Sequence, residues 1–159
     1  MDKPTVYIET SIVSYLAASP SRHPVTARNQ RLTHEWWNTH RHRYALYTST
    51  LVADEARSGD PVLARHRLAL LQPIPRLEPE REEVRDLARE LRAYVPLPAN
   101  AHADALHIAL AAVEKRAYLL TWDSRHIANP RLHTRIEKVC EARGFTMPVL
   151  CTPREMKGG

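Results

Sequence analysis

The sequence predicts an α/β domain built around a largely parallel β-sheet. Short apolar segments rich in β-branched and aromatic residues alternate along the chain with longer segments of helical periodicity. This alternation is typical of βαβ units, in which helices connect parallel strands and cover the sheet. The 159 residues contain no internal repeat and no linker-like segment. We therefore expect a single domain over residues 1–152, followed by a C-terminal tail at residues 153–159.

Five segments have the composition of strands. Residues 5–8 (TVYI) and 118–121 (YLLT) are short and apolar, as buried strands are. Residues 43–48 alternate in polarity, and residues 147–150 form a last apolar segment. A short extended piece between Pro73 and Pro75 can lie only at a sheet edge, because proline donates no backbone hydrogen bond.

Helices are predicted between the strands. The first begins after Glu9-Thr10-Ser11, where hydroxyl groups can cap free N–H groups. A long polar helix from Pro24 to about Arg43 contains Trp36 and Trp37, which are adjacent, so that only one is expected to face the core easily. The remaining helices are predicted over residues 49–57, 61–71, 79–94, 101–116 and 132–143. Helix 101–116 is apolar nearly all round, which is typical of a buried helix.

Composition excludes several classes of protein. The two cysteines, Cys140 and Cys151, lack CxxC spacing, which argues against a disulfide scaffold and a structural zinc site. The apolar stretch at residues 12–18 is too short to cross a membrane, and no signal-peptide layout is visible, so we expect a cytoplasmic protein. The net charge of +5, carried mostly by arginine, fits a polyanionic partner, although arginine usage also follows genome composition.

Acidic residues occupy positions where parallel sheets bind ligands. Glu9 directly follows the first strand, and Asp123 follows strand 118–121. If these strands are parallel neighbours, both carboxylates emerge at the same edge of the sheet. Asp104 lies in the first turns of the buried helix, where a carboxylate is rarely found unless it is paired or bound to a metal. Glu55 follows the second strand, whereas its neighbour Asp54 points about 100° away and is expected to be solvated.

Four converging carboxylates require neutralisation. Two like charges ~4 Å apart cost on the order of 4 kcal/mol at an effective dielectric constant near 20. An oxygen-only ligand shell suits Mg²⁺ or Mn²⁺. Taken singly, each acid also has a structural interpretation: helix capping for Glu9, an ordinary surface residue for Glu55 and a strand-end turn for Asp123.

Four sequence segments resemble the PIN-domain nucleases, and specifically their VapC-like toxin branch. The segments are VYIETSIVSYL (6–16), STLVADEA (49–56), ADALHIALAA (103–112) and LLTWD (119–123), in the order and spacing of that family over nearly the whole chain. The resemblance implies a three-layer α/β/α sandwich around a parallel sheet of roughly five strands. It places the family's four acids on Glu9, Glu55, Asp104 and Asp123, as catalytic residues and ligands of Mg²⁺ or Mn²⁺.

The resemblance also implies an activity and partners. The activity is metal-dependent cleavage of RNA, single-stranded or structured, by the toxin of a toxin–antitoxin pair. The partners are the RNA substrate, a protein antitoxin and a second copy in a homodimer. The family usually has aspartate at the position of Glu9, and the added methylene moves the carboxylate by roughly 1.5 Å. Thr10 and Ser11 occupy the family's hydroxyl positions, where they could hold a water.

Two other functions stay open at this stage. The chain could be a non-catalytic PIN-like module that binds RNA or protein, or a housekeeping RNA-processing nuclease. The glycine-rich loops that bind nucleotides are excluded, because no glycine follows the first strand. A serine hydrolase is excluded because the GxSxG motif is absent from the sequence. Of the histidines beside the acids, His107 is expected to pack in the core, while His126 either lies in a solvated turn or contacts phosphate. An RNA path is one interpretation of the basic residues Arg28, Arg31, Arg41, His42 and Arg43, and an ordinary polar helix face is the other.

Overall fold

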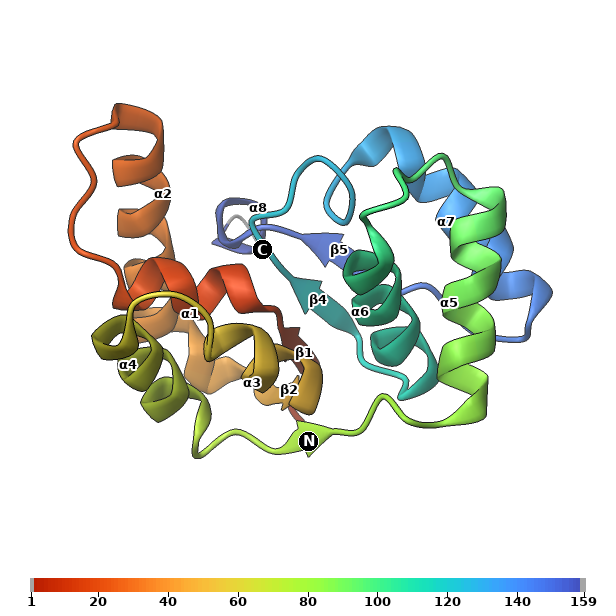
Figure 1. The fold of residues 1–159 in the computed structure, drawn as a ribbon, viewed down its shortest axis with the longest axis horizontal. Helices are drawn as coiled ribbons and strands as arrows, with labels where there is room; N and C mark the ends of the chain where they lie inside the picture. The colour runs from red at the N-terminus through yellow and green to blue at the C-terminus, as the bar shows by residue number, and fades with distance from the viewer. Residues whose placement is uncertain (1, 158–159) are drawn as a thin grey trace.

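The computed structural model describes residues 2–157, which form a five-stranded parallel sheet with helices on both faces (Figure 1). The strands are β1 (Thr5–Ile8), β2 (Ala45–Ser49), β3 (Arg76–Leu77), β4 (Tyr118–Leu120) and β5 (Val149–Cys151). Their spatial order is β3-β2-β1-β4-β5, and every pairing is parallel. The predicted α/β/α sandwich around a parallel, five-stranded sheet is confirmed.

The helices divide between the two faces of the sheet. One layer holds α1 (Thr10–Ala17), α2 (Pro24–Glu35), α3 (Thr50–Ala56) and α4 (Pro61–Leu71), with α1 in contact with the other three. The opposite layer holds α5 (Glu82–Tyr94), α6 (His102–Val113) and α7 (Pro130–Ala142), in which α5 packs against both others. None of the helices in the described part of the chain is long and apolar enough to span a membrane.

The order of the strands reverses beside β1. The chain builds β1, β2 and β3 in one direction, then crosses the sheet through α5 and α6 and returns to the other side of β1 as β4. In parallel sheets, ligands bind beyond the carboxyl ends of the strands at such a reversal. Here the ends of β1 and β4 are held together by a backbone hydrogen bond of 3.1 Å from Glu9 N–H to the Leu120 carbonyl.

A continuous apolar core fixes this arrangement. Ile8 on β1, Leu120 on β4 and Ile108 on α6 are fully buried, as are most residues of α6. The apolar character of segment 101–116 therefore predicted its burial correctly. Its helix is shorter than predicted and ends at Val113.

The long helix predicted to reach Arg43 is interrupted. After α2 ends at Glu35, Trp36–His40 form a π-helical segment, η1, and Arg41–Arg43 a 3₁₀ turn, η2. Both tryptophans are buried, so the expectation that only one could face the core was wrong. A π-helical turn takes up an extra residue and shifts the helical phase. Trp36 stacks on Tyr44 with ring centroids 5.9 Å apart, and the Arg41 guanidinium covers the Trp37 ring at 4.7 Å.

Other boundaries also differ from the prediction; the edge strand β3, for example, follows Pro75 rather than lying between Pro73 and Pro75. Helix α5 begins at Glu82, where the acidic residues Glu82 and Glu83 occupy the first turn, rather than at Pro79. Within the predicted tail, α8 (Pro153–Lys157) contacts α2 and η1, and its Met156 packs in the core. Residues 158–159 lie outside the described residues.

Candidate active site

Glu9 lies at the end of β1 and caps the N-terminus of α1. Its Oε1 accepts three hydrogen bonds: from the Ser11 N–H (3.1 Å), the Ser11 hydroxyl (2.5 Å) and the Thr121 hydroxyl (2.6 Å). The residue is only 8% exposed. Within residues 2–157, Oε2 accepts no hydrogen bond, so one oxygen of this fixed carboxylate is available to a cation. The capping interpretation and a ligand role are thus compatible, because they use different oxygens.

Glu55, in the second half of α3, is held by two donors from other elements. Its Oε1 accepts hydrogen bonds from the Thr10 hydroxyl at the start of α1 and from His107 Nε2 on α6, the latter at 2.9 Å. Burial favours the neutral acid, but the hydrogen bonds and charge of His107, together with Thr10, outweigh it and lower the pKa of Glu55 below its ordinary value. Glu55 is therefore a carboxylate anion at neutral pH.

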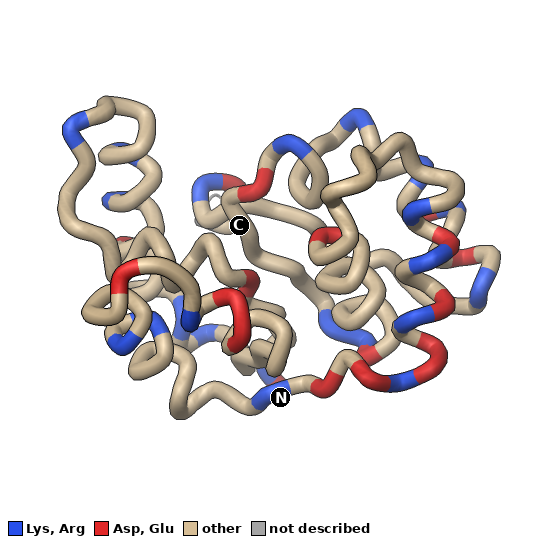
Figure 2. Tube along the Cα trace, in the orientation of Figure 1, with Lys and Arg blue, Asp and Glu red and all other residues tan. Residues whose placement is uncertain are grey.

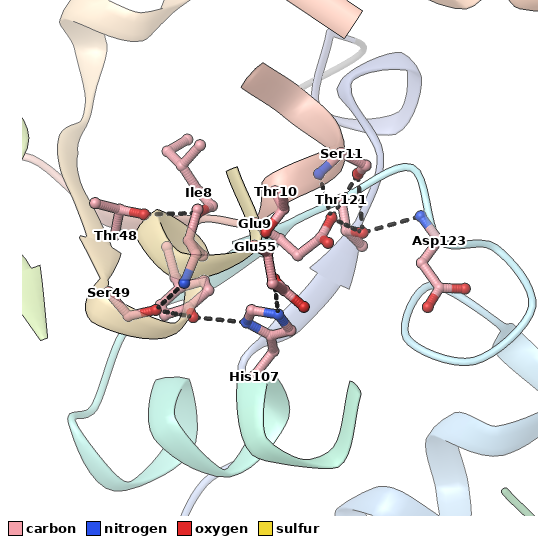
Figure 3. Close-up of polar contacts among 12 residues, drawn as sticks. Ile8, Glu9, Thr10, Ser11, Thr48, Ser49, Glu55, His107, Thr121 and Asp123 are labelled. Atoms are coloured by element: carbon pink, nitrogen blue, oxygen red, sulfur yellow. Dashed lines mark hydrogen bonds and ion pairs between the residues drawn. The ribbon is translucent and has the colours of Figure 1, made fainter. Parts of the chain in front are cut away.

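His107 belongs to a buried chain of hydrogen bonds (Figure 3). Its Nδ1 lies 2.7 Å from the Tyr7 hydroxyl on β1, which lies 2.8 Å from Oγ of Ser49, the N-cap of α3. Burial lowers the pKa of His107, yet the hydrogen bond to Glu55 and the charges of Glu9, Glu55 and Asp104 raise it above the ordinary value. The chain links β1, α3 and α6 and fixes the direction of Glu55.

Asp104 and Asp123 form the second acidic pair. Asp104 lies in the first turn of α6, and Asp123 follows β4. His126 Nδ1 lies 2.7 Å from Asp104 Oδ2 and 3.7 Å from Asp123 Oδ2. Burial and the negative charge of Asp123 raise the pKa of Asp104 to about 6, although His126 opposes the shift. The raised pKa reflects first the burial of the Asp104 carboxyl group and second the negative charge of Asp123.

The structure divides the four predicted acids into two groups, each completed by a histidine. In each group the possible ligand atoms all lie within 4.8 Å of one another; the groups are Glu9, Glu55 and His107, and Asp104, Asp123 and His126. The groups are adjacent, because the Thr121 hydroxyl donates to Glu9 and accepts a 2.9 Å hydrogen bond from the Asp123 N–H. The arrangement is therefore two neighbouring clusters rather than four acids converging on one point.

The donor set fits divalent cations. Of the basic residues in the described part of the chain, no lysine or arginine forms an ion pair with any of the four acids. Carboxylate oxygens and imidazole nitrogens are ligands for Mg²⁺, Mn²⁺ and related ions. The neighbouring Asp54 contrasts with this set, since its side chain is 72% exposed and pairs with Arg57, as expected for a solvated residue.

Comparison with known proteins gives a structural likeness but no relative by sequence. No model of a known protein family matches the chain, and no curated protein matches its sequence. Among solved structures, a chain of VapBC2 from Rickettsia felis, crystallised with a DNA fragment from their promoter, matches with a TM-score of 0.49. The match has 18% identity and covers 80% of this chain and 95% of that chain. At 18% identity the likeness concerns the backbone arrangement alone.

Several residues of the site were not predicted. His107 was expected to pack in the core; it is buried as expected, but both ring nitrogens have polar partners. His107 follows Asp104, and His126 follows Asp123, by three residues, which is a signal that each could face the same way as its acid. Thr10 and Ser11, expected near a water, instead bind the carboxylates of Glu55 and Glu9. Tyr7 and Thr121 carry no such sequence signal.

A groove of about 380 Å³ lies between α5 and the helices that carry Glu55 and Asp104, α3 and α6, although none of the four acids lines it. Arg85, Arg89 and Arg92 line it from one face of α5, while His102 and Leu106 line it from α6 on either side of Asp104. Basic and acidic residues alternate along α5 (Figure 2), and the helix turns these arginines toward the groove. The three arginines thus give the groove a basic wall, opposite the acidic residues Asp54 and Glu80 that also line it.

Proposed function

We propose that this chain is a metal-dependent endoribonuclease that cleaves RNA phosphodiester bonds. The observation that carries the proposal is the presence of Glu9, Glu55, Asp104 and Asp123 at the carboxyl edge of the sheet without a lysine or arginine counterion among the described residues. Such a set is costly for stability alone and is explained by cation binding. We propose Mg²⁺ or Mn²⁺ as the ion.

Each acid has a proposed task. When bound, a divalent cation would polarise a phosphoryl oxygen and lower the pKa of a water. Glu9, held by Ser11 and Thr121, and Asp104 would each offer a carboxylate oxygen to a cation, one from each cluster. Glu55 and Asp123 complete its surroundings and orient the attacking water, for which Glu55 is already directed by His107 and Thr10. The substitution of glutamate for the family's usual aspartate at position 9 keeps a carboxylate oxygen available.

The biological setting is proposed from the sequence resemblance. The VapC-like segments favour the toxin of a toxin–antitoxin pair, with an antitoxin protein and a second copy of the chain as partners. The net charge of +5 and the arginine-lined groove favour RNA as the substrate. The two cysteines are free and buried, in keeping with action in the cytoplasm. A small antitoxin-like reading frame beside the gene would favour the toxin over a housekeeping nuclease.

The test is RNA cleavage by matched acid variants. Purified wild-type protein is expected to cleave single-stranded RNA with Mg²⁺ or Mn²⁺ and to lose cleavage with EDTA. Asp104→Asn and Glu55→Gln should lower the rate by about 100-fold or more, because each removes a charge from the metal site. Glu141→Gln is the control, since Glu141 is an exposed acid on α7 that lies outside both clusters and the groove; it should cleave like the wild type.

Two results would contradict the proposal. If Asp104→Asn cleaves RNA as fast as the wild type, the acidic site takes no part in cleavage. Metal-independent RNA binding by the wild type, with no cleavage under any divalent cation, would instead favour the non-catalytic RNA-binding module. Circular dichroism of every variant separates loss of activity from loss of folding.

A further inference from the structure

We propose that His126 is a direct metal ligand, so that the ion between Asp104 and Asp123 occupies a mixed nitrogen and oxygen site that selects Mn²⁺ over Mg²⁺. This inference rests on the metal-dependent nuclease proposed above and narrows the identity of its ion. The four-carboxylate site implied by the sequence resemblance contains no histidine, so the assignment comes from the geometry around residues 104, 123 and 126.

The loop after β4 aims His126 back at the acids. Asp123 Oδ1 accepts hydrogen bonds from the N–H groups of Arg125 (3.1 Å) and His126 (3.0 Å), and the Asp123 carbonyl accepts one from Ala128 (2.8 Å). This turn commits Oδ1 of Asp123 to the backbone. It leaves Oδ2 facing the imidazole, 3.7 Å from Nδ1.

Three ligand atoms from two separate segments, α6 and the turn after β4, meet in a small space. Nδ1 of His126 and carboxylate oxygens of Asp104 and Asp123 all lie within 4.8 Å of one another. Ligand atoms about 2.1 Å from a shared ion are themselves roughly 3–4 Å apart, so small side-chain movements suffice to seat an ion among them. The side chains of the three residues are 22–25% exposed, which gives an ion access while water fills its remaining positions.

His107 contrasts with His126. It is 1% exposed, its Nδ1 meets Tyr7 and its Nε2 meets Glu55, so its bonding capacity is used inside the protein. Nδ1 of His126 faces the two aspartates, and a cation can replace the proton that lies between Nδ1 and Asp104. We therefore assign His107 to positioning Glu55 and His126 to the metal.

The ligand set determines which ion is preferred. Mg²⁺ favours oxygen ligands and retains its waters, whereas Mn²⁺ and later transition metals also accept imidazole nitrogen. Two carboxylates and one imidazole should therefore bind Mn²⁺ more tightly than Mg²⁺. A site of carboxylates alone would discriminate less between the two ions.

The test detects nitrogen bound to the metal directly. Electron spin echo envelope modulation of the full chain with one equivalent of Mn²⁺ is expected to show ¹⁴N modulation. His126→Asn, which replaces the nitrogen donor by an amide, should abolish it, whereas His66→Gln on the exposed face of α4 should retain it. By calorimetry, His126→Asn should weaken Mn²⁺ binding by about tenfold or more and Mg²⁺ binding by less than about threefold.

The outcomes separate this inference from the nuclease proposal. Absence of ¹⁴N modulation in the wild type, or its persistence in His126→Asn, overturns the assignment of His126. If RNA cleavage still depends on Asp104, the nuclease proposal then stands without a histidine ligand. Modulation that is lost in His126→Asn, in a protein that does not cleave RNA, supports the metal site and contradicts the nuclease. Thermal unfolding of His126→Asn and His126→Ala verifies that both fold.

Discussion

Asp104 makes the stability of the metal-free protein depend on pH. Its pKa is raised to about 6, so the folded chain binds this proton more tightly than the unfolded chain does. Above pH 6 the charged Asp104 carboxylate therefore destabilises the fold. This destabilisation is lost as the pH falls through 6 toward the pKa of Asp104 in the unfolded chain. Metal binding should oppose protonation at the same oxygens.

Asp104→Asn tests this dependence. In EDTA at pH 7.5, the variant is expected to be more stable than the wild type by on the order of 1–2 kcal/mol, because the neutral amide removes a partly buried charge and its repulsion by Asp123. The difference should shrink toward pH 5. Urea unfolding at both pH values measures it. A variant less stable than the wild type at pH 7.5 would show that the Asp104 carboxylate is a structural residue.

His107 and His126 show what sequence patterns omit at the residue scale. The acids could be predicted because a carboxylate in an apolar helix, or after a buried strand, stands out against its neighbours. The four acids divide into two pairs because of the way α6 packs against β1 and α3. The spacing of side chains within one element does not specify that packing. A histidine in an apolar segment has the same sequence signature whether it packs passively or binds an acid.

The ends of β1 and β4 are joined through the hydroxyl of Thr121. It donates to Glu9 and accepts from the Asp123 N–H, so it orients one acid of each group. Thr48 on β2 provides a matched comparison, because it is equally buried and its hydroxyl donates to the Ile8 carbonyl at 3.2 Å (Figure 3). The Thr121 hydroxyl thus contacts one acid of each cluster, whereas the Thr48 hydroxyl contacts only a backbone carbonyl.

Replacement of each threonine by valine separates positioning from stability. Both variants should lose about 1–2 kcal/mol in the free energy of unfolding, because each removes one buried hydroxyl. Only Thr121→Val should also weaken Mn²⁺ binding, by about tenfold, since Glu9 and Asp123 lose a shared partner. Calorimetry with Mn²⁺ provides the measurement. Equal Mn²⁺ affinities in the two variants would limit Thr121 to a structural role.

Elements with strong periodicity were predicted well, and those shaped by tertiary contacts were not. Segment 5–8 was predicted as a strand and is β1, and 61–71 was predicted as a helix and is α4. Over residues 36–43, the sequence predicted that the α-helix continues. The backbone instead forms π-helical and 3₁₀ turns, and both tryptophans are buried in the core. Such a change depends on packing against Tyr44 and α8, which lie outside the segment's own pattern.

At the scale of the whole molecule, the strand order separates the acids from part of the basic surface. The acids lie at the carboxyl ends of the strands, whereas Arg41 and Arg43 precede the amino end of β2, at the opposite edge of the sheet. The basic segment that the sequence offered as an RNA path is therefore partly remote from the site. The groove lined by Arg85, Arg89 and Arg92 is bounded by α3 and α6, the helices that carry Glu55 and Asp104, and is the path that we propose instead.

Paired arginine variants distinguish the two paths. Arg89→Ala/Arg92→Ala should weaken binding of RNA by about tenfold and reduce the slope of log K against log salt by roughly 2, because two phosphates are no longer neutralised. The ion pair of Arg89 with Asp86 is exposed, so its removal should change stability little. Arg28→Ala/Arg31→Ala on α2 removes the same charge from the other path and should leave both quantities nearly unchanged. Fluorescence anisotropy with Asp104→Asn as the background prevents cleavage during the titration. If the α2 pair weakens binding and the α5 pair does not, RNA approaches over the first helical layer and the groove beside α5 has another occupant.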